Sequence, residues 1–219
     1  NQVEIKNYKK KIMCGIIGIA SNKSVSSNII KSLKKLEYRG YDSAGIATIL
    51  NDEINEKKCT GRVDSLEKIL FKTPSEGVLG IGHVRWATHG APSNVNAHPH
   101  SSEEVSVVHN GIIENSTILK KNLEKKGYQF KSQTDTEVIT VLLTDFLKNF
   151  DLIEAINKTL EKLNGSFALG MLFKKYKNVV VGARRGSPLA VGYGHNENYL
   201  GSDSYALKSM TNKITYLDD

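Results

Sequence analysis

The chain has 219 residues, of which 39% are hydrophobic and 24% charged, a composition typical of a globular protein and not of a disordered or fibrous one. The length suits one large domain, and no apolar run approaches the roughly 18 residues that cross a bilayer, so we expect no membrane partner. Of the net charge of +7, residues 1–13 carry +3. The remaining lysines are dispersed, which favours solvated helix faces over a nucleic-acid-binding surface.

Residues 1–13 end in a methionine directly before Cys14. We predict that they are an N-terminal extension: a tag, misread upstream sequence or a propeptide. Lysines before a short apolar stretch imitate a secretory signal, but the stretch is at the lower length limit and lacks a small-residue cleavage site. Cytoplasmic location is therefore expected, where Cys14 and Cys59 stay reduced instead of pairing.

Hydrophobic periodicity and turn residues predict the following elements in chain order. The first half contains strands at 14–20, 44–50, 55–63, 78–86 and 105–109, with helices at 26–38 and near 66–70. Helices follow at 116–126, from a capping box at 134–137, and at 152–163, and then strands at 167–173, 179–183, 189–192, 199–202 and 214–217. Strands, a helical middle and strands again at hairpin spacing favour an antiparallel, layered α+β fold over a βαβ alternation.

The densest group of reactive residue types lies between residues 80 and 111, where five of the six histidines fall. A zinc site is disfavoured, because the i, i+4 or Cys-x-x-Cys spacing of known sites is missing. A phosphate loop at Gly77, Gly80 and Gly82 is also disfavoured, since the pattern matches neither glycine-rich fingerprint. We interpret three of the histidines as hydrogen-bonded structural residues: His83, His100 and His109.

Cys14, taken alone, is interpreted as a small buried residue. If Met13 is the initiator and is removed, however, Cys14 carries a thiol and a free α-amino group with a pKa of about 7.7–8.0. A nucleophile and a general base then belong to one residue, and no separate catalytic histidine is needed.

Six sequence blocks, in this order, make the chain resemble the class II glutamine amidotransferases, and within them the glucosamine-6-phosphate synthases. The blocks are Cys14–Gly18, Leu36–Gly45, Gly82–Gly90, Asn96–His100, His109–Asn115 and Thr134–Val138. The resemblance covers residues 14–219 and implies one domain there, a four-layer αββα sandwich of antiparallel sheets of the N-terminal nucleophile hydrolase type.

The resemblance assigns Cys14 as the nucleophile, and the Asn110 side chain with the Gly111 N–H as the oxyanion hole. Arg85 is expected to bind the glutamine α-carboxylate, because a planar guanidinium suits bidentate pairing. Asp135 is expected to bind the α-ammonium group, and an acid in the first turn of a helix is also favoured by the helix dipole.

By the same resemblance, Trp86 corresponds to a residue that closes over glutamine and gates ammonia passage, although a lone tryptophan also suits a core or interface. Thr88, His89 and His98 correspond to positions that line the glutamine pocket. Arg39 is expected beside the nucleophile; its alternative is a buried ion pair with Glu37 or Asp42.

The implied reaction is hydrolysis of L-glutamine to glutamate and ammonia through a cysteinyl thioester, with no metal or organic cofactor. The sugar-isomerase-like domains of the synthases have no counterpart in the sequence, so we expect no synthase activity from this polypeptide alone. Phosphoribosyl pyrophosphate amidotransferase and asparagine synthetase remain alternatives within the class. A catalytically silent glutamine-binding module and a basic nucleic-acid-binding module are the alternatives outside it.

Overall fold

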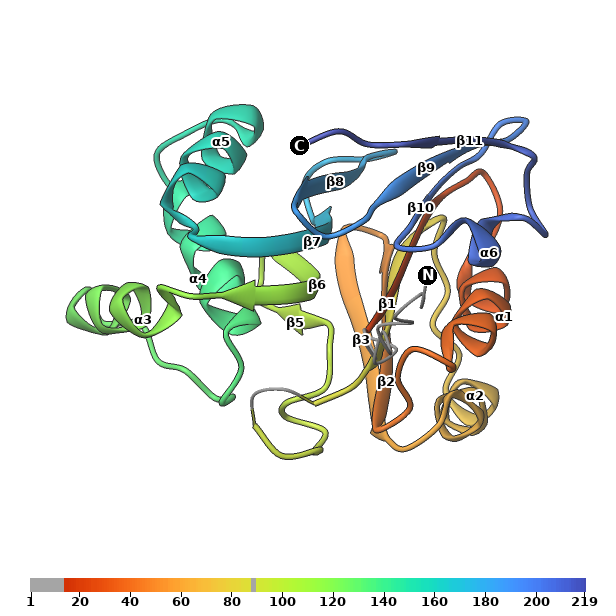
Figure 1. Ribbon diagram of the computed structural model, residues 1–219, viewed down its shortest axis with the longest axis horizontal. Helices are drawn as coiled ribbons and strands as arrows, with labels where there is room; N and C mark the ends of the chain where they lie inside the picture. Colours follow the sequence, from red (N-terminus) through yellow and green to blue (C-terminus); the bar gives the residue numbers. More distant parts are fainter. Residues whose placement is uncertain (1–13, 88–89) are drawn as a thin grey trace, which may run out of the picture.

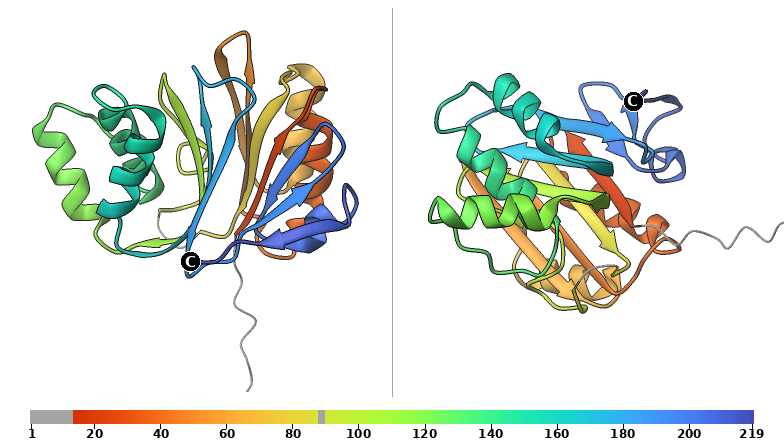
Figure 2. Two further views of the ribbon diagram at one scale, coloured as in Figure 1. Left: turned by 90° about the horizontal axis from the view of Figure 1, so that it is seen from above. Right: turned by 60° about the vertical axis from the view of Figure 1, so that its left-hand side comes forward.

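The computed structural model describes residues 14–87 and 90–219. Its strands form two antiparallel sheets that pack face to face, with helices covering the outer face of each (Figure 1). The left-hand view in Figure 2 shows the four layers in order, helices, sheet, sheet and helices. The predicted αββα sandwich is confirmed.

The first sheet has seven strands in the order β11-β9-β10-β1-β4-β2-β3, and the second has four in the order β5-β6-β7-β8. The strands of the first sheet are β1 (Gly15–Ala20), β2 (Ser43–Leu50), β3 (Glu53–Thr60), β4 (Leu79–Arg85), β9 (Ala190–Tyr193), β10 (Asn198–Gly201) and β11 (Lys213–Tyr216). Those of the second are β5 (His100–Ser101), β6 (Val105–Ile113), β7 (Gly165–Phe173) and β8 (Val180–Arg185).

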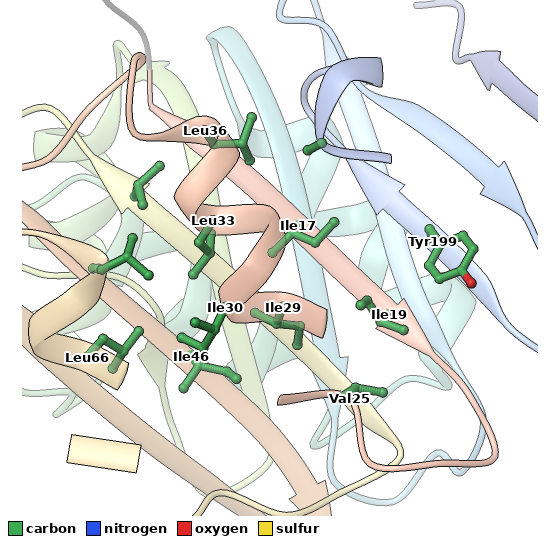
Figure 3. Packing of buried hydrophobic residues seen from close by; sticks show 14 of the residues in the cluster. Ile17, Ile19, Val25, Ile29, Ile30, Leu33, Leu36, Ile46, Leu66 and Tyr199 are labelled. Atoms are coloured by element: carbon green, nitrogen blue, oxygen red, sulfur yellow. The ribbon is translucent and has the colours of Figure 1, made fainter. Parts of the chain in front are cut away.

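Helices α1 (Ser26–Leu36) and α2 (Val63–Lys72) cover the first sheet, together with the short α6 (Ser204–Leu207). The apolar stripe of α1 is buried against the strands, as Figure 3 shows for Ile29, Ile30 and Leu33. Glycines in β4 let α1 approach closely, since a Cβ at Gly82 would lie 2.5 Å from a carbon of Ile29. The glycines of this segment therefore serve packing.

Helices α3 (Ser116–Lys125), α4 (Thr136–Phe146) and α5 (Leu152–Lys162) cover the second sheet. The predicted stripe of α4 is confirmed, because Val138, Ile139 and Leu143 are buried in the cluster that contains Phe167 of β7. A third apolar cluster fills the space between the sheets and includes Ile16, Ile81, Val108, Ala168 and Leu172. No helix among the described residues is long and apolar enough to span a membrane.

Three expectations from the sequence need correction. The strand expected at 55–63 spans Glu53–Thr60, and Val63 begins α2. The strand expected to end at His109 continues to Ile113, because its register with β7 runs through to Gly165. The capping box is only half formed: Thr134 Oγ1 accepts from the Glu137 N–H at 3.4 Å, but the Glu137 carboxylate accepts from the N–H groups of residues 131 and 132. The Thr134 N–H donates instead to Ser132 Oγ at 3.3 Å. Two short elements, β5 and α6, escaped the sequence analysis.

Candidate active site

Residues that lie far apart in the sequence meet at one end of the sandwich. Cys14 directly precedes β1, and Arg85 is the last residue of β4, the neighbour of β1. Asn110 and Gly111 belong to β6 of the facing sheet, and Asp135 directly precedes α4. The predicted catalytic and substrate-binding positions within the described residues are thus supplied by both sheets and by the start of a helix.

The thiol of Cys14 is held by the backbone of Trp86. The Trp86 N–H donates to Cys14 Sγ at 3.2 Å, and Sγ also lies 3.5 Å from the Trp86 carbonyl oxygen. Burial raises the pKa of the Cys14 thiol, while the Trp86 N–H and the charge of Arg85 act in the opposite direction. At neutral pH the resting sulfur is therefore a thiol, and a base is needed to make it a nucleophile.

The carbonyl oxygen of Cys14 accepts two hydrogen bonds, from Asn110 Nδ2 at 2.8 Å and from Arg39 Nε at 3.2 Å. Arg39 also pairs through Nη1 with Asp203 Oδ2 at 3.0 Å, and Tyr38 donates to the same carboxylate. Arg39 thus lies beside Cys14, and the alternative of a pair with Glu37 or Asp42 is wrong.

Both acids proposed as alternative partners of Arg39 are engaged elsewhere. Glu37 accepts from the backbone N–H of Val63 at 2.7 Å and lies 3.5 Å from Arg62. Asp42 accepts from the backbone N–H of Ala87 through its carboxylate. The true partner, Asp203, follows β10, and no local pattern in the sequence singles it out.

Gly40 and Asp42 hold the backbone that carries Arg85 and Trp86. A Cβ at Gly40 would lie 2.6 Å from the carbonyl carbon of Arg85 and 2.7 Å from the backbone nitrogen of Trp86. The Asp42 N–H donates to the Arg85 carbonyl oxygen at 3.1 Å. Neither residue was among the predicted site residues, although both lie in the block 36–45 that carries part of the family resemblance.

Arg85 and Asp135, which are expected to bind the α-carboxylate and the α-ammonium group of glutamine, both make hydrogen bonds to backbone groups. Arg85 is 4% exposed and donates from Nη2 to the carbonyl oxygen of Gly90 at 3.2 Å. Asp135 Oδ2 accepts from the Ile113 N–H at 2.8 Å, and Oδ1 lies 3.9 Å from His109 Nδ1. Asp135 also stands at the N-terminus of α4, where a negative charge is favoured.

Gly111 has a backbone that only glycine adopts readily. Its φ is +128°, and a Cβ there would lie 2.0 Å from the carbonyl oxygen of Ser166. In β6 the Asn110 residue is buried, whereas the next residue, Gly111, is exposed. The backbone beside the Asn110 amide is therefore accessible to a ligand.

Of the four remaining residues predicted to line the glutamine pocket, the structure describes two, Trp86 and His98. Trp86 is half-buried, with its ring edge-on to Tyr41 at 5.5 Å between centroids. His98 is buried, and its ring nitrogens lie 3.4 Å from the His109 backbone nitrogen and 3.1 Å from Thr136 Oγ1. Thr88 and His89 lie outside the described residues. Contact of these four with glutamine stays a prediction.

The three histidines interpreted as structural are buried and hydrogen-bonded, which confirms that interpretation. His83 Nε2 lies 3.0 Å from both the His109 carbonyl oxygen and Asn110 Oδ1. His100 Nε2 contacts Thr134 Oγ1, and His109 Nδ1 contacts Thr136 Oγ1. Within the described residues, no group of three or more histidine, cysteine or acidic side chains is arranged to hold a metal ion.

Burial keeps His83, His98 and His100 neutral. It lowers the pKa of His83 to about 3 and the pKa of His98 and His100 well below the usual value, and the nearby positive charge of Arg85 acts in the same direction. The rings of His83 and His98 lie 4.3 Å apart. These three imidazoles are therefore uncharged at neutral pH.

Known proteins with similar sequences share one domain type. A family model described as "Glutamine amidotransferase domain" matches residues 83–209. The isomerizing glutamine–fructose-6-phosphate aminotransferases of Zymomonas mobilis and Mesorhizobium japonicum are each 50% identical to this chain over 208 residues. The matches cover 94% of this chain and 34% of each relative, so the chain spans about a third of their length.

Solved structures agree with the sequence matches. The glutamine phosphoribosylpyrophosphate amidotransferase of B. subtilis superposes with a TM-score of 0.80 at 27% identity, covering 93% of this chain and 44% of that chain. A glutamine aminotransferase class-II domain protein of Silicibacter pomeroyi shares the fold, with a TM-score of 0.62 at 14% identity over 86% of this chain and 88% of that one. The chain therefore belongs to the class II glutamine amidotransferase domain family, with the α+β fold of the N-terminal nucleophile type.

Proposed function

We propose that this chain hydrolyses the side-chain amide of L-glutamine to glutamate and ammonia through a thioester on Cys14. The observation that carries the proposal is the contact between Cys14, at the start of β1, and Asn110, on the facing sheet, through a 2.8 Å hydrogen bond. This contact brings Cys14, the proposed nucleophile, next to the Asn110 side-chain amide and to a glycine with exposed backbone, which supports the proposal. A nucleophile beside convergent N–H donors suits acyl transfer.

Arg85 and Asp135 orient the substrate in this proposal. The Arg85 guanidinium binds the α-carboxylate of glutamine, and the Asp135 carboxylate binds the α-ammonium group. Trp86 closes over the bound glutamine, and Thr88, His89 and His98 line its pocket. The salt bridge to Asp203 fixes Arg39, which in turn holds the Cys14 carbonyl oxygen.

The reaction proceeds in two steps. The α-amine of Cys14 takes the thiol proton, Sγ attacks the side-chain carbonyl carbon, and a C–S bond forms. The α-ammonium group of Cys14 then protonates the nitrogen of the glutamine side-chain amide, the C–N bond breaks and ammonia leaves. In the second step the α-amine of Cys14 takes a proton from water and the hydroxide attacks the thioester. The C–S bond breaks, glutamate leaves, and the α-ammonium group of Cys14 returns the proton to the thiolate.

The tetrahedral intermediates of both steps carry an oxyanion. Asn110 Nδ2 has two protons, so one can stay on the Cys14 carbonyl oxygen while the other binds the oxyanion. The Gly111 N–H is the second donor. Donors fixed before the reaction begins need no reorganisation as the charge develops.

This mechanism requires a free α-amine at Cys14. Residues 1–13 make the Cys14 nitrogen an amide, which has no useful basicity, and the Cys14 thiol has a raised pKa. We therefore propose that residues 1–13 are an extension, that residues 14–219 form the working domain, and that removal of the extension up to Met13 activates it.

We further propose that the ammonia serves synthesis of glucosamine 6-phosphate from fructose 6-phosphate. The relatives that are 50% identical over 208 residues are glutamine–fructose-6-phosphate aminotransferases, whereas the phosphoribosylpyrophosphate amidotransferase is 27% identical. The acceptor chemistry then belongs to isomerase domains that work with this domain in cis or in trans.

The test of the proposed function is glutamate formation by the form that begins at Cys14. We expect steady turnover, loss of turnover in Cys14→Ala, and near-normal turnover in Cys59→Ala, which removes the other free cysteine. Activity that survives in Cys14→Ala would overturn the mechanism. Glutamine binding without turnover in the wild type would identify a silent glutamine-binding module.

A further inference from the structure

His83 lies directly behind the Asn110 amide and links the two sheets. It is fully buried on β4, and its Nε2 lies 3.0 Å from Asn110 Oδ1 on β6 of the facing sheet. The same nitrogen lies 3.0 Å from the carbonyl oxygen of His109. Both neighbours are oxygen acceptors, so Nε2 must carry the proton and donate.

The orientation of the Asn110 amide is fixed from both ends. Its Nδ2 faces the Cys14 carbonyl oxygen, which can only accept, and its Oδ1 faces the His83 Nε2–H, which can only donate. A flipped amide would set oxygen against oxygen at Cys14 and N–H against N–H at His83. Two independent contacts therefore select the same orientation.

His83 is held in this state by its surroundings. Its Nδ1 is buried and has no hydrogen-bond partner among the described residues, so a proton there would leave both an unpaired donor and a buried charge. Burial and the neighbouring Arg85 oppose the charged form, whereas the contacts of Nε2 favour it less strongly. The neutral Nε2–H tautomer follows.

We propose that His83 is a positioning residue, whose Nε2–H holds Asn110 Oδ1 so that Asn110 Nδ2 is presented to the reacting centre. The inference rests on the proposed function for its catalytic consequence, but the tautomer and the amide orientation are properties of the resting protein. It adds a role to a residue that the sequence analysis treated as structural alone.

The kinetic test compares two replacements of His83. His83→Gln keeps an N–H donor near the Nε2 position, and we expect kcat within about fivefold of the wild type. His83→Leu removes the donor, and we expect kcat to fall by about 10- to 1,000-fold with KM changed less than about threefold, because the loss acts through one oxyanion-hole donor. Equal kcat for His83→Leu and the wild type would overturn the inference.

A double variant separates positioning from general damage. If His83 acts through Asn110, His83→Leu adds no more than about twofold to the loss of kcat in Asn110→Ala. Multiplicative losses would overturn the inference. The matched control is His100→Leu, another buried histidine that bonds Thr134 and not Asn110; we expect lower stability with kcat within about twofold.

A spectroscopic test on the wild-type chain needs no turnover and no replacement. Long-range ¹H–¹⁵N correlation spectra distinguish the two neutral tautomers and the imidazolium. We expect His83 to show the Nε2–H tautomer throughout pH 5–8, and an Nδ1–H tautomer or a cation would overturn the inference even if His83→Leu fails to fold. A form that begins at Cys14 and shows the expected tautomer but no glutaminase activity would instead overturn the proposed function.

Discussion

At the scale of single residues, the candidate site holds a cysteine whose thiol stays protonated at rest, so the proposed reaction needs a base. Burial raises the pKa of Cys14, and the Trp86 N–H that contacts Sγ opposes that effect only in part. Arg85 contributes a fixed positive charge nearby. In the proposed mechanism, the reactivity of Cys14 therefore depends on its own α-amine.

Substitution of Arg85 by lysine tests its role in binding glutamine. Lysine keeps the charge but loses the paired N–H donors that match a carboxylate. Because hydrogen bonds to charged groups contribute about 1.5–3 kcal/mol, we expect KM for glutamine to rise about 10- to 100-fold with a smaller change in kcat. Steady-state kinetics measure both, and a fall in kcat at constant KM would contradict a role in substrate binding.

Asn110→Ala tests the oxyanion hole at the same scale. The variant removes one donor and leaves the Gly111 N–H, so we expect kcat to fall about 100- to 1,000-fold while glutamine still binds. Single-turnover measurement of thioester formation checks this directly. Normal thioester formation would contradict the assigned role.

At the scale of elements, the turn between α1 and β2 fixes the backbone at the end of β4. Gly40 packs against the Arg85–Trp86 peptide, and the Asp42 carboxylate accepts from the Ala87 N–H. These contacts position the N–H that reaches Cys14 Sγ. The geometry around Cys14, the proposed nucleophile, thus depends on a turn to which no catalytic side chain is assigned.

Gly40→Ala is expected to disturb the site and the fold together. The added Cβ would lie 2.6–2.8 Å from backbone atoms of Arg85 and Trp86, and such overpacking costs about 1–3 kcal/mol. We expect lower unfolding free energy and a kcat at least tenfold lower. The control is Gly127→Ala, where φ is +91° but nothing lies within 4 Å, so stability falls and kcat does not. Unchanged kcat in Gly40→Ala would show that this turn does not position the site.

Local patterns predicted most elements because their hydrophobic periods are clear. The apolar stripes of α1 and α4 and the turn residues Asn51 and Asp52 can be recognised in the sequence. In the structure both turn residues have positive φ. The short β5 and α6 have two and four residues, too few for a period to show. The partnership of Arg39 with Asp203 depends on the pairing of β1 with β10, which no local pattern reveals.

The family resemblance, not the local chemistry, predicted most of the proposed site. A lone Cys14 and an asparagine–glycine pair at 110–111 have no spacing rule that brings them together, because they belong to different sheets. The role of His83 depends on which of its nitrogens faces Asn110, and a sequence contains no such information.

At the scale of the whole molecule, the buried histidines make stability depend on pH. His83, His98 and His100 resist protonation when folded but take up protons near pH 6.5 when unfolded. Below pH 6.5 the unfolded state therefore binds more protons, and stability falls as pH falls, by about 1.4 kcal/mol per pH unit for each histidine.

We expect the unfolding free energy to drop by roughly 6 kcal/mol between pH 7 and pH 5, a large part of the 5–15 kcal/mol typical of a domain. Urea titrations at pH 7, 6 and 5 measure it. His100→Gln should reduce the drop by about a third, and the control His195→Gln, which changes an exposed histidine, should not. A free energy that stays constant across this range would contradict the account of the cluster.

The central claim, that Cys14 becomes a nucleophile through its own freed α-amine, is tested most directly by intact-mass spectrometry with an electrophilic glutamine analogue. Two forms are compared, the 219-residue chain and the form that begins at Cys14. We predict one adduct per molecule on Cys14 in the shorter form, competed by glutamine and absent from Cys14→Ala, with little labelling of the longer form. Equal labelling and equal glutamine turnover in the two forms would contradict the claim.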